Sequence, residues 1–289
     1  MKLTITPMQE PFGALVSGWN SAEVLTANDV KSIREALATF SILVFRGHSS
    51  PTDEQLVGFA KSFGELIEGS GFFGDSQRFP EILRVNNLKS KDGFPLGTGG
   101  SEACDWHADY SFMPRCGLIS FLDAVQTPAS GGRTYFANTH TVLESLPDAE
   151  RKRFSKLAAY HDTLAADRNI RVEEAKKKTA RAGTELPVKP KATHPLIMSN
   201  PDTGREALYV NPMLTRYVEG LSAAESHVLL EHLFERITRA DNVYGHDWQE
   251  GDLVMWDNIS LIHRRDSFDP HETRSMRQLT TLLPETVAN

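Results

Sequence analysis

The first part of the chain has apolar residues at helical spacing. Between residues 28 and 40 they recur every three or four positions, which predicts an amphipathic helix. Residues 41–45 are a short apolar run of the kind found in buried strands. Thr52 to Gln55 has the form of a capping box, and the apolar positions behind it predict a second helix that ends near residue 63.

Strands dominate the rest of the chain. Segments with strand-like composition occur at residues 82–86, 118–126, 134–137, 207–211, 252–257 and 276–283. One late helix is predicted, from a capping box at Ser222 to about residue 239. Strands and helices do not alternate one for one, so a doubly wound parallel sheet is not expected. The pattern favours a mainly β fold, a sandwich or jelly roll with flanking helices.

A polar stretch at about residues 165–193 differs from its surroundings. It contains three consecutive lysines, a glycine and two prolines, and few apolar residues. Long polar loops of this kind often act as active-site lids, which is the expectation here. Neither an internal repeat nor a second domain boundary is evident, so residues 1–289 are expected to form one domain.

Composition and charge exclude several classes of function. Of the 289 residues, 40% are hydrophobic and 24% are charged, as in an ordinary globular protein, and no window resembles a membrane span. The net charge of −7 argues against nucleic acid as a partner. The first residues lack the apolar core of a signal peptide. The only cysteines, Cys104 and Cys116, fit neither a disulfide scaffold nor a zinc site, so we expect a cytoplasmic protein.

Three residues could hold a metal ion. In an extended segment, the side chains of His107 and Asp109 would lie on one face, because strand side chains alternate with period two. A predicted strand that ends at His263 could add a second imidazole, which completes the two-histidine, one-carboxylate set of non-haem Fe(II) oxygenases. Taken alone, the pair His107 and Asp109 could be a polar strand end, and His263 could be a surface histidine.

Arg274 points to an anionic ligand. By strand parity it shares the inward face of its strand with Met276 and Gln278, whereas Arg277 points the other way. A buried arginine is costly unless an anion pairs with it, and a carboxylate can bind it with two hydrogen bonds. A salt bridge to an acidic side chain of the protein itself is the alternative.

Together with other motifs, these residues resemble the taurine dioxygenase and chlorophenoxyacetate dioxygenase family of Fe(II)/2-oxoglutarate enzymes. The matching segments occur in the order that the family has and run from residue 42 almost to the C-terminus. They are residues 42–47, 106–112, 130–134, 203–211, 248–258 and 263–265, followed by Arg274.

The resemblance implies a double-stranded β-helix (jelly-roll) core with Fe(II) held by His107, Asp109 and His263. It implies that 2-oxoglutarate chelates the iron and places its far carboxylate against Arg274, with a hydrogen bond from Thr134. O2 is the second co-substrate, and the products are succinate, CO2 and an oxidised substrate. The outcome is hydroxylation of an unactivated C–H bond, which can lead to cleavage of a C–heteroatom bond or to desaturation.

The substrate is the least defined part of this hypothesis. Members of the family often carry a second arginine four residues after the 2-oxoglutarate arginine, but here that position is Gln278. Gln278, Tyr110 and Asn87 are candidates for substrate contact, and Lys189 and Lys191 are weaker ones. We expect a small, carboxylate-bearing or amino-acid-like molecule.

Two other functions are weighed against this one. A jelly-roll binding or regulatory protein with a structural or vestigial metal site would retain metal without 2-oxoglutarate-dependent oxygen uptake. A zinc hydrolase would use the same three ligands, but it leaves Arg274 unexplained. Homodimers and homotetramers are both common among enzymes of this kind, and the sequence leaves the oligomeric state open.

Overall fold

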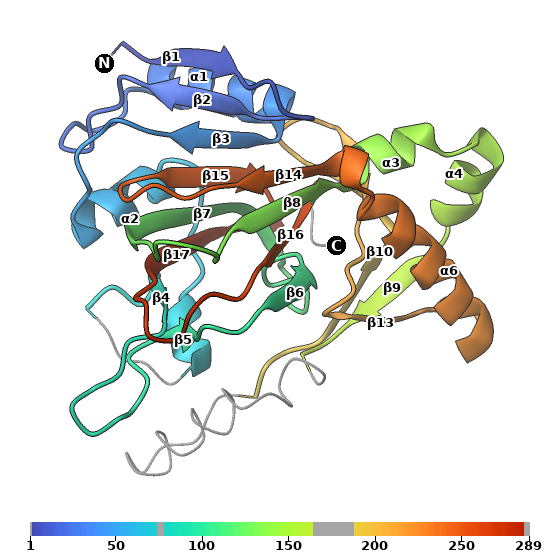
Figure 1. Ribbon diagram of the computed structural model, residues 1–289. Helices are drawn as coiled ribbons and strands as arrows, with labels where there is room; N and C mark the ends of the chain where they lie inside the picture. The colour runs from blue at the N-terminus through green and yellow to red at the C-terminus, as the bar shows by residue number, and fades with distance from the viewer. Residues whose placement is uncertain (1, 74–77, 164–187, 286–289) are drawn as a thin grey trace.

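The computed structural model describes residues 2–73, 78–163 and 188–285. Its largest element is an eight-stranded sheet (Figure 1). In spatial order its strands are β1 (Thr4–Pro7), β2 (Ala14–Ser17), β3 (Ile42–Phe45), β15 (Leu253–Asp257), β7 (Gly117–Gln126), β17 (Ser275–Leu282), β4 (Leu83–Asn86) and β5 (Thr98–Gly99). Neighbours pair antiparallel except β2 with β3 and β4 with β5, which are parallel.

A four-stranded antiparallel sheet lies in front of the large sheet in Figure 1. Its order is β14 (Val243–His246), β8 (Thr134–Asn138), β16 (Leu261–Arg265) and β6 (Cys104–His107). Two smaller sheets lie to one side. They are β10 (Ala192–Pro195), β9 (Ala158–His161) and β13 (Thr215–Val218), and the pair β11 (Ile197–Ser199) and β12 (Glu206–Leu208).

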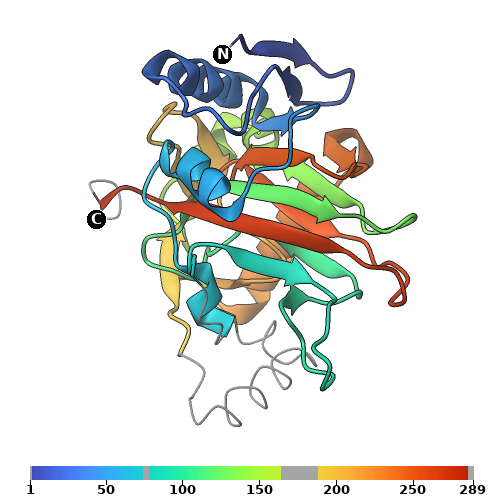
Figure 2. The ribbon, with the colours of Figure 1, turned by 90° about the vertical axis from the view of Figure 1, so that its left-hand side faces the viewer.

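The helices lie outside the two main sheets. They are α1 (Ala27–Phe40), α2 (Asp53–Lys61), α3 (Thr139–Ser145), α4 (Asp148–Phe154) and α6 (Ala223–Ile237), with the 3-10 turns η1 (Gly69–Phe73) and η3 (Ala240–Asn242). Helices α1 and α2 contact the outer face of the large sheet, and α2 crosses it in Figure 2. Helices α3, α4 and α6 gather at the end of the molecule that also holds β9, β10 and β13 (Figure 1).

The large sheet is buried on both faces, which explains its nearly continuous apolar strands. In β3, Leu43 and Phe45 face the cluster under the helices, whereas Ile42 and Val44 face a second cluster between the sheets. Trp256 of β15 is fully buried in that second cluster. This second cluster therefore fixes the spacing between the large sheet and the four-stranded sheet, which carries His107 and His263.

The jelly-roll prediction is confirmed, and several helix boundaries agree closely. The capping boxes at Thr52 and Ser222 are both present, and α1 begins at Ala27 behind a third capping box at Thr26. The predicted strand at 207–211 is shorter and lies at Glu206–Leu208. Strand β6 ends at His107, so Asp109 lies in the following turn rather than in the same strand. Residues 164–187, most of the predicted lid, lie outside the described residues.

Candidate active site

The register of the four-stranded sheet aligns the candidate ligands. His263 of β16 lies opposite His107 of β6 on one side and opposite Phe136 of β8 on the other. Residues that face each other across antiparallel strands project from the same face of the sheet. The ring of His263 packs against Phe136 and, at 4.9 Å between centroids, against Trp256 of the large sheet. The histidine is buried, not on the surface.

Asp109 completes a compact group of three ligands. Its Oδ1 lies 3.8 Å from His107 Nε2 and 3.7 Å from His263 Nε2, and the two imidazole centroids are 4.1 Å apart. All three ligand atoms lie within 4.8 Å of one another, and no other group of this kind occurs in the described parts of the chain. Two imidazole nitrogens and one carboxylate oxygen suit a divalent transition metal such as iron(II).

The turn that carries Asp109 is fixed by neighbouring side chains. The hydroxyl of Ser120 donates a 2.7 Å hydrogen bond to Oδ2, and Gln278 contributes a further hydrogen bond to the carboxylate. The buried amide of Asn258 accepts from the backbone N–H of Asp109 and donates to its carbonyl, both at 2.9 Å. Ser120 therefore holds one carboxylate oxygen and leaves Oδ1 directed at the imidazoles.

The electrostatics of the triad favour a bound cation. Burial raises the pKa of Asp109, and burial together with the charge of His107 lowers the pKa of His263 well below its usual value. Burial also acts to lower the pKa of His107, but Cys104 and Asp109 outweigh it and raise that pKa to about 9. A metal ion bound among these side chains would stabilise the ionised carboxylate and would require both imidazoles to be neutral, so metal binding should release a proton from His107.

A second row of side chains lies two residues further along the same strands. Thr134 of β8 is paired with His246 of β14 and with Arg265 of β16. Trp248 Nε1 donates a 3.0 Å hydrogen bond to the Thr134 hydroxyl oxygen. The hydroxyl proton is then available to a carboxylate, because the indole occupies only an acceptor position.

Arg274 is a buried cation that lacks a protein partner. Its side chain is 2% exposed, and within the described ranges its guanidinium forms no hydrogen bond or ion pair. Its carbon Cζ lies 5.9 Å from the centroid of the Trp248 ring, and burial lowers its pKa to about 9. Gly132 permits the approach, because a Cβ there would lie 3.3 Å from Arg274 Cδ. A bound anion would supply the missing partner.

Arg277 points away from this space, as strand parity predicts. It donates to Asp123 and Asp53 and to the carbonyl of Pro51, each at 2.8 Å. These bonds attach the start of α2 to the outer face of the large sheet. Arg277 therefore has a structural role.

The three candidate substrate residues have different surroundings. Tyr110 is buried in an apolar cluster that includes Phe72, Phe112 and Leu214, and its backbone adopts a left-handed conformation with φ of 55°. Asn87 accepts from the backbone N–H of Arg274 and donates to the Glu272 carbonyl, so it fixes the loop before β17. Gln278 is the residue that bonds Asp109.

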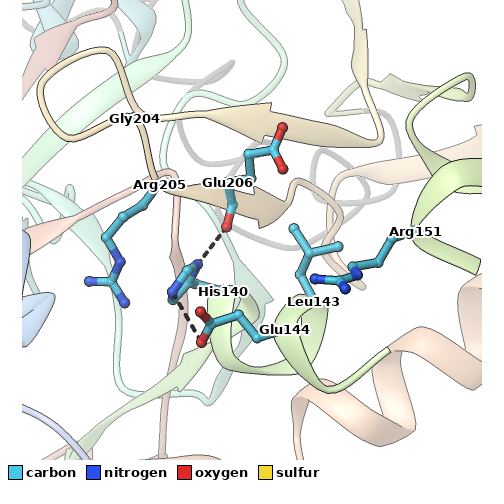
Figure 3. Close-up of a pocket in the computed structure, with 7 residues that line it drawn as sticks. All are labelled: His140, Leu143, Glu144, Arg151, Gly204, Arg205 and Glu206. Carbon is cyan, nitrogen blue, oxygen red and sulfur yellow. Dashed lines mark hydrogen bonds and ion pairs between the residues drawn. The ribbon is translucent and has the colours of Figure 1, made fainter. Parts of the chain in front are cut away.

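A pocket of about 340 Å³ is lined by residues of α3, α4 and the segment around β12, and Figure 3 shows these residues. None of its lining residues is a triad member, and its two arginines and two glutamates balance in charge. His140 bonds the Glu206 carbonyl at 2.6 Å and lies 3.3 Å from the carboxylate of Glu144, as the dashed lines in Figure 3 show. The two arginines of the pocket bond residues outside it, Arg151 the carboxylate of Asp148 and Arg205 the carbonyl of Ala38, so the polar groups of the pocket are largely engaged.

Comparisons with known proteins decide the family. The model of the taurine catabolism dioxygenase TauD, TfdA family matches residues 4–280. The chain belongs to this family. It is 36% identical over 280 residues to pentalenolactone F synthase of Streptomyces avermitilis, covering 94% of this chain and 92% of that enzyme. It is 32% identical over 293 residues to the α-ketoglutarate-dependent 2,4-dichlorophenoxyacetate dioxygenase of Cupriavidus pinatubonensis, covering 98% of both.

Solved structures agree with the TauD/TfdA assignment. AAD-2 in complex with Mn(II) and N-oxalylglycine is similar with a TM-score of 0.77 at 27% identity, over 99% of both chains. A taurine dioxygenase from Burkholderia xenovorans gives a TM-score of 0.78 at 25% identity, over 98% of this chain and 90% of that one. The chain is thus an Fe(II)- and 2-oxoglutarate-dependent dioxygenase that acts on a small molecule. No described helix has the length and apolar character of a membrane span.

Sequence reasoning gave no role to three residues that the fold brings close to the candidate residues. Ser120 lies within an apolar strand, and Asn258 and Arg265 stand in segments that match the family but were assigned no contact of their own. Strand parity places Ser120 on the same face as Leu118 and Leu122, but only the fold shows that Asp109 meets it. Cross-strand register reveals Arg265 in the same way.

Proposed function

We propose that His107, Asp109 and His263 hold the iron and that Arg274 and Thr134 bind the far carboxylate of 2-oxoglutarate. The observation that carries this assignment is the buried guanidinium of Arg274, which no described residue neutralises, in the same inter-sheet space as the ligand triad. When bound, the iron supplies the chemistry that couples decarboxylation of 2-oxoglutarate to oxidation of a substrate C–H bond by O2.

The residues of the chain position the reactants and limit access of water. The rings of Phe136 and Trp256 shield His263, and Ser120 and Asn258 hold Asp109 in one orientation. Arg274 and Thr134 fix the orientation of the co-substrate by charge and by a directed hydrogen bond. Such preorganisation matters because the oxidising group must reach one C–H bond and no other.

Anaerobic ligand addition tests this assignment directly. Wild-type protein should show the weak visible charge-transfer band of an iron–keto acid chelate after addition of Fe(II) and 2-oxoglutarate. The substitution His107→Ala should abolish the band and succinate formation, and Arg274→Met should chiefly raise the 2-oxoglutarate requirement. His140→Ala, a buried histidine outside the triad, is the matched control and should leave both readouts unchanged. Normal turnover of His107→Ala would overturn the ligand assignment.

For the substrate, we propose a small molecule with a hydrocarbon ring system and a carboxylate. The apolar cluster around Tyr110 and Phe72 can pack against rings, and Gln278 stands where a sulfonate-binding arginine would be expected. Relatives named for dichlorophenoxyacetate and phenoxypropionate, and the synthase named for a lactone, support this class. In a screen read by succinate release, phenoxyacetates and ring-fused acids should exceed taurine, and efficient turnover of taurine would contradict the proposal.

For the setting of the enzyme, we propose the cytoplasm and assembly as a homodimer or homotetramer. Support for the cytoplasm comes from Cys104 and Cys116, neither of which forms a disulfide in the described parts of the chain, as is usual in a reducing compartment. The proposed oligomeric state rests on the homodimers and homotetramers that are common in this family. Light scattering of the purified protein tests it, and a monomer at micromolar concentration would refute it.

A further inference from the structure

Arg265 is a second buried arginine on the inner face of the four-stranded sheet. It lies two residues after His263 on β16, so both side chains project from the same face. Its side chain is 7% exposed, whereas neighbouring Arg264 points outward and lies over the rings of Tyr135 and Trp106. The two adjacent arginines therefore occupy different environments.

The position of Arg265 is set by the register of the sheet. It lies directly opposite Thr134 of β8 and opposite Cys104 of β6. Directly opposed residues of an antiparallel pair have Cβ atoms about 5 Å apart. Arg265 therefore lies in the same row of side chains as Thr134, the residue that we assign to the co-substrate.

Arg265 also fixes the chain segment that leads to the iron ligands. Its Nη2 donates to the carbonyl of Gly99 at 2.9 Å and to the carbonyl of Glu102. Gly99 has a φ of 104°, and a Cβ at this position would lie 3.5 Å from Arg265 Nη1. The guanidinium thus connects the row of Thr134 to the segment that enters β6.

The charge of Arg265 acts on Arg274. After burial, it is the main cause that lowers the pKa of Arg274, so the two guanidinium groups repel each other inside the protein. Two like charges near one another are stabilised when an anion binds beside them. 2-Oxoglutarate carries two negative charges, and its far carboxylate is the one that reaches the arginine end of the site.

We propose that Arg265 is a second positioning residue for 2-oxoglutarate, which supplies positive charge to the far carboxylate and holds the Gly99–Glu102 segment beside it. This inference rests on the proposed function, because it assumes that Arg274 receives that carboxylate. A purely structural role would affect all keto acids alike, whereas a charge role requires the far carboxylate.

The experiment compares two keto acids in anaerobic Fe(II)-loaded protein. 2-Oxobutyrate has the same chelating end as 2-oxoglutarate but lacks the far carboxylate. The variant Arg265→Gln keeps donors for the two carbonyls and removes the charge, and Arg265→Met removes both. In Arg265→Gln, the Kd of 2-oxoglutarate from the charge-transfer band should rise about tenfold, equivalent to about 1.4 kcal/mol, and that of 2-oxobutyrate should change less than twofold. Arg265→Met should also weaken 2-oxobutyrate, because it loses the bonds to both carbonyls.

Arg264→Gln, one residue away on the outer face, is the matched control and should change neither Kd. As a second readout, 2-oxoglutarate should raise the melting temperature of the Mn(II)-loaded Arg265→Gln variant less than that of the wild type. Equal losses for both keto acids, or unchanged 2-oxoglutarate affinity in Arg265→Gln, would overturn the proposal. Absence of the band in wild-type protein would instead refute the proposed function.

Discussion

The hydroxyl of Ser120 provides a sharp test of how the carboxylate ligand is held. It donates to Asp109 Oδ2 at 2.7 Å, while Oδ1 is the oxygen that faces both imidazoles. The hydroxyl of Thr280, 3.1 Å from Ser120 Oγ, fixes its direction. The substitution Ser120→Ala removes this bond and leaves the three ligand side chains intact.

The expected loss follows from the charge of the acceptor. A hydrogen bond to a charged group contributes about 1.5–3 kcal/mol, and loss of a residue that orients a metal ligand typically lowers metal affinity about 10- to 100-fold. Ser120→Ala should therefore raise the Kd for Mn(II) by about that factor. The free Mn(II) signal in electron paramagnetic resonance measures it, in the presence of 2-oxoglutarate.

The control is an equivalent bond elsewhere in the core. Ser260 donates to Asp257 Oδ2, also at 2.7 Å and also buried, but Asp257 is not a ligand. Ser260→Ala and Ser120→Ala should each lower the free energy of unfolding by about 1–3 kcal/mol, but Ser260→Ala should leave the Mn(II) affinity unchanged. If Ser120→Ala binds Mn(II) within twofold of wild type, the Ser120 bond does not orient the ligand and the reasoning fails.

Three further predictions concern residues around the site. Gly69→Ala would place a Cβ 2.3 Å from the hydroxyl of Tyr110, so it should lower the free energy of unfolding in urea by about 1–3 kcal/mol. Tyr110→Phe should relieve most of that cost. An equal loss from Gly69→Ala in the wild type and in Tyr110→Phe would exclude this clash. Trp248→Phe removes the donor to Thr134 and should weaken 2-oxoglutarate binding several-fold in the band titration, whereas unchanged affinity would show that the indole bond is dispensable. Asp252 is desolvated, but bonds from Arg46 and other neighbours lower its pKa from 3.8 to about 2, so its contribution of about 2 kcal/mol is complete above pH 4 and is lost as the pH falls towards 2. The difference in unfolding free energy between wild type and Asp252→Asn should shrink accordingly between pH 5 and pH 2, and a constant difference would refute the assignment.

Local sequence predicts the elements that local interactions specify. Helix α2 follows from its capping box and apolar spacing, and β7 follows from its long apolar run. Helices α3 and α4 were not predicted, because their segment is short, polar and divided by Pro147. The three-stranded sheet around β9 was also missed, since strands of four residues carry too little pattern to stand out.

The residues of the candidate site show the same difference between local and long-range information. The three candidate ligands could be named from the sequence because they stand in an ordered set of motifs that resembles a known family, and Arg274 because an arginine on the inward face of a strand is costly without an anion. Ser120 and Asn258 could not, because each makes its decisive contact with Asp109, a residue that only the folded chain brings near. Contacts between distant segments depend on strand register, and no local pattern encodes that register.

Strand register also sets the candidate metal ligands beside the residues proposed to bind the co-substrate. On β16, His263 belongs to the row of the metal ligands and Arg265 to the row of Thr134, and these rows are separated by two residues. Because side chains alternate with period two, a slip of one residue would turn both rows away from the inter-sheet space at once. The apolar cluster around Trp256 opposes such a slip, since it would expose Leu261 as well. The core that stabilises the jelly roll therefore also sets the spacing between the row of His107 and His263 and the row of Thr134 and Arg265.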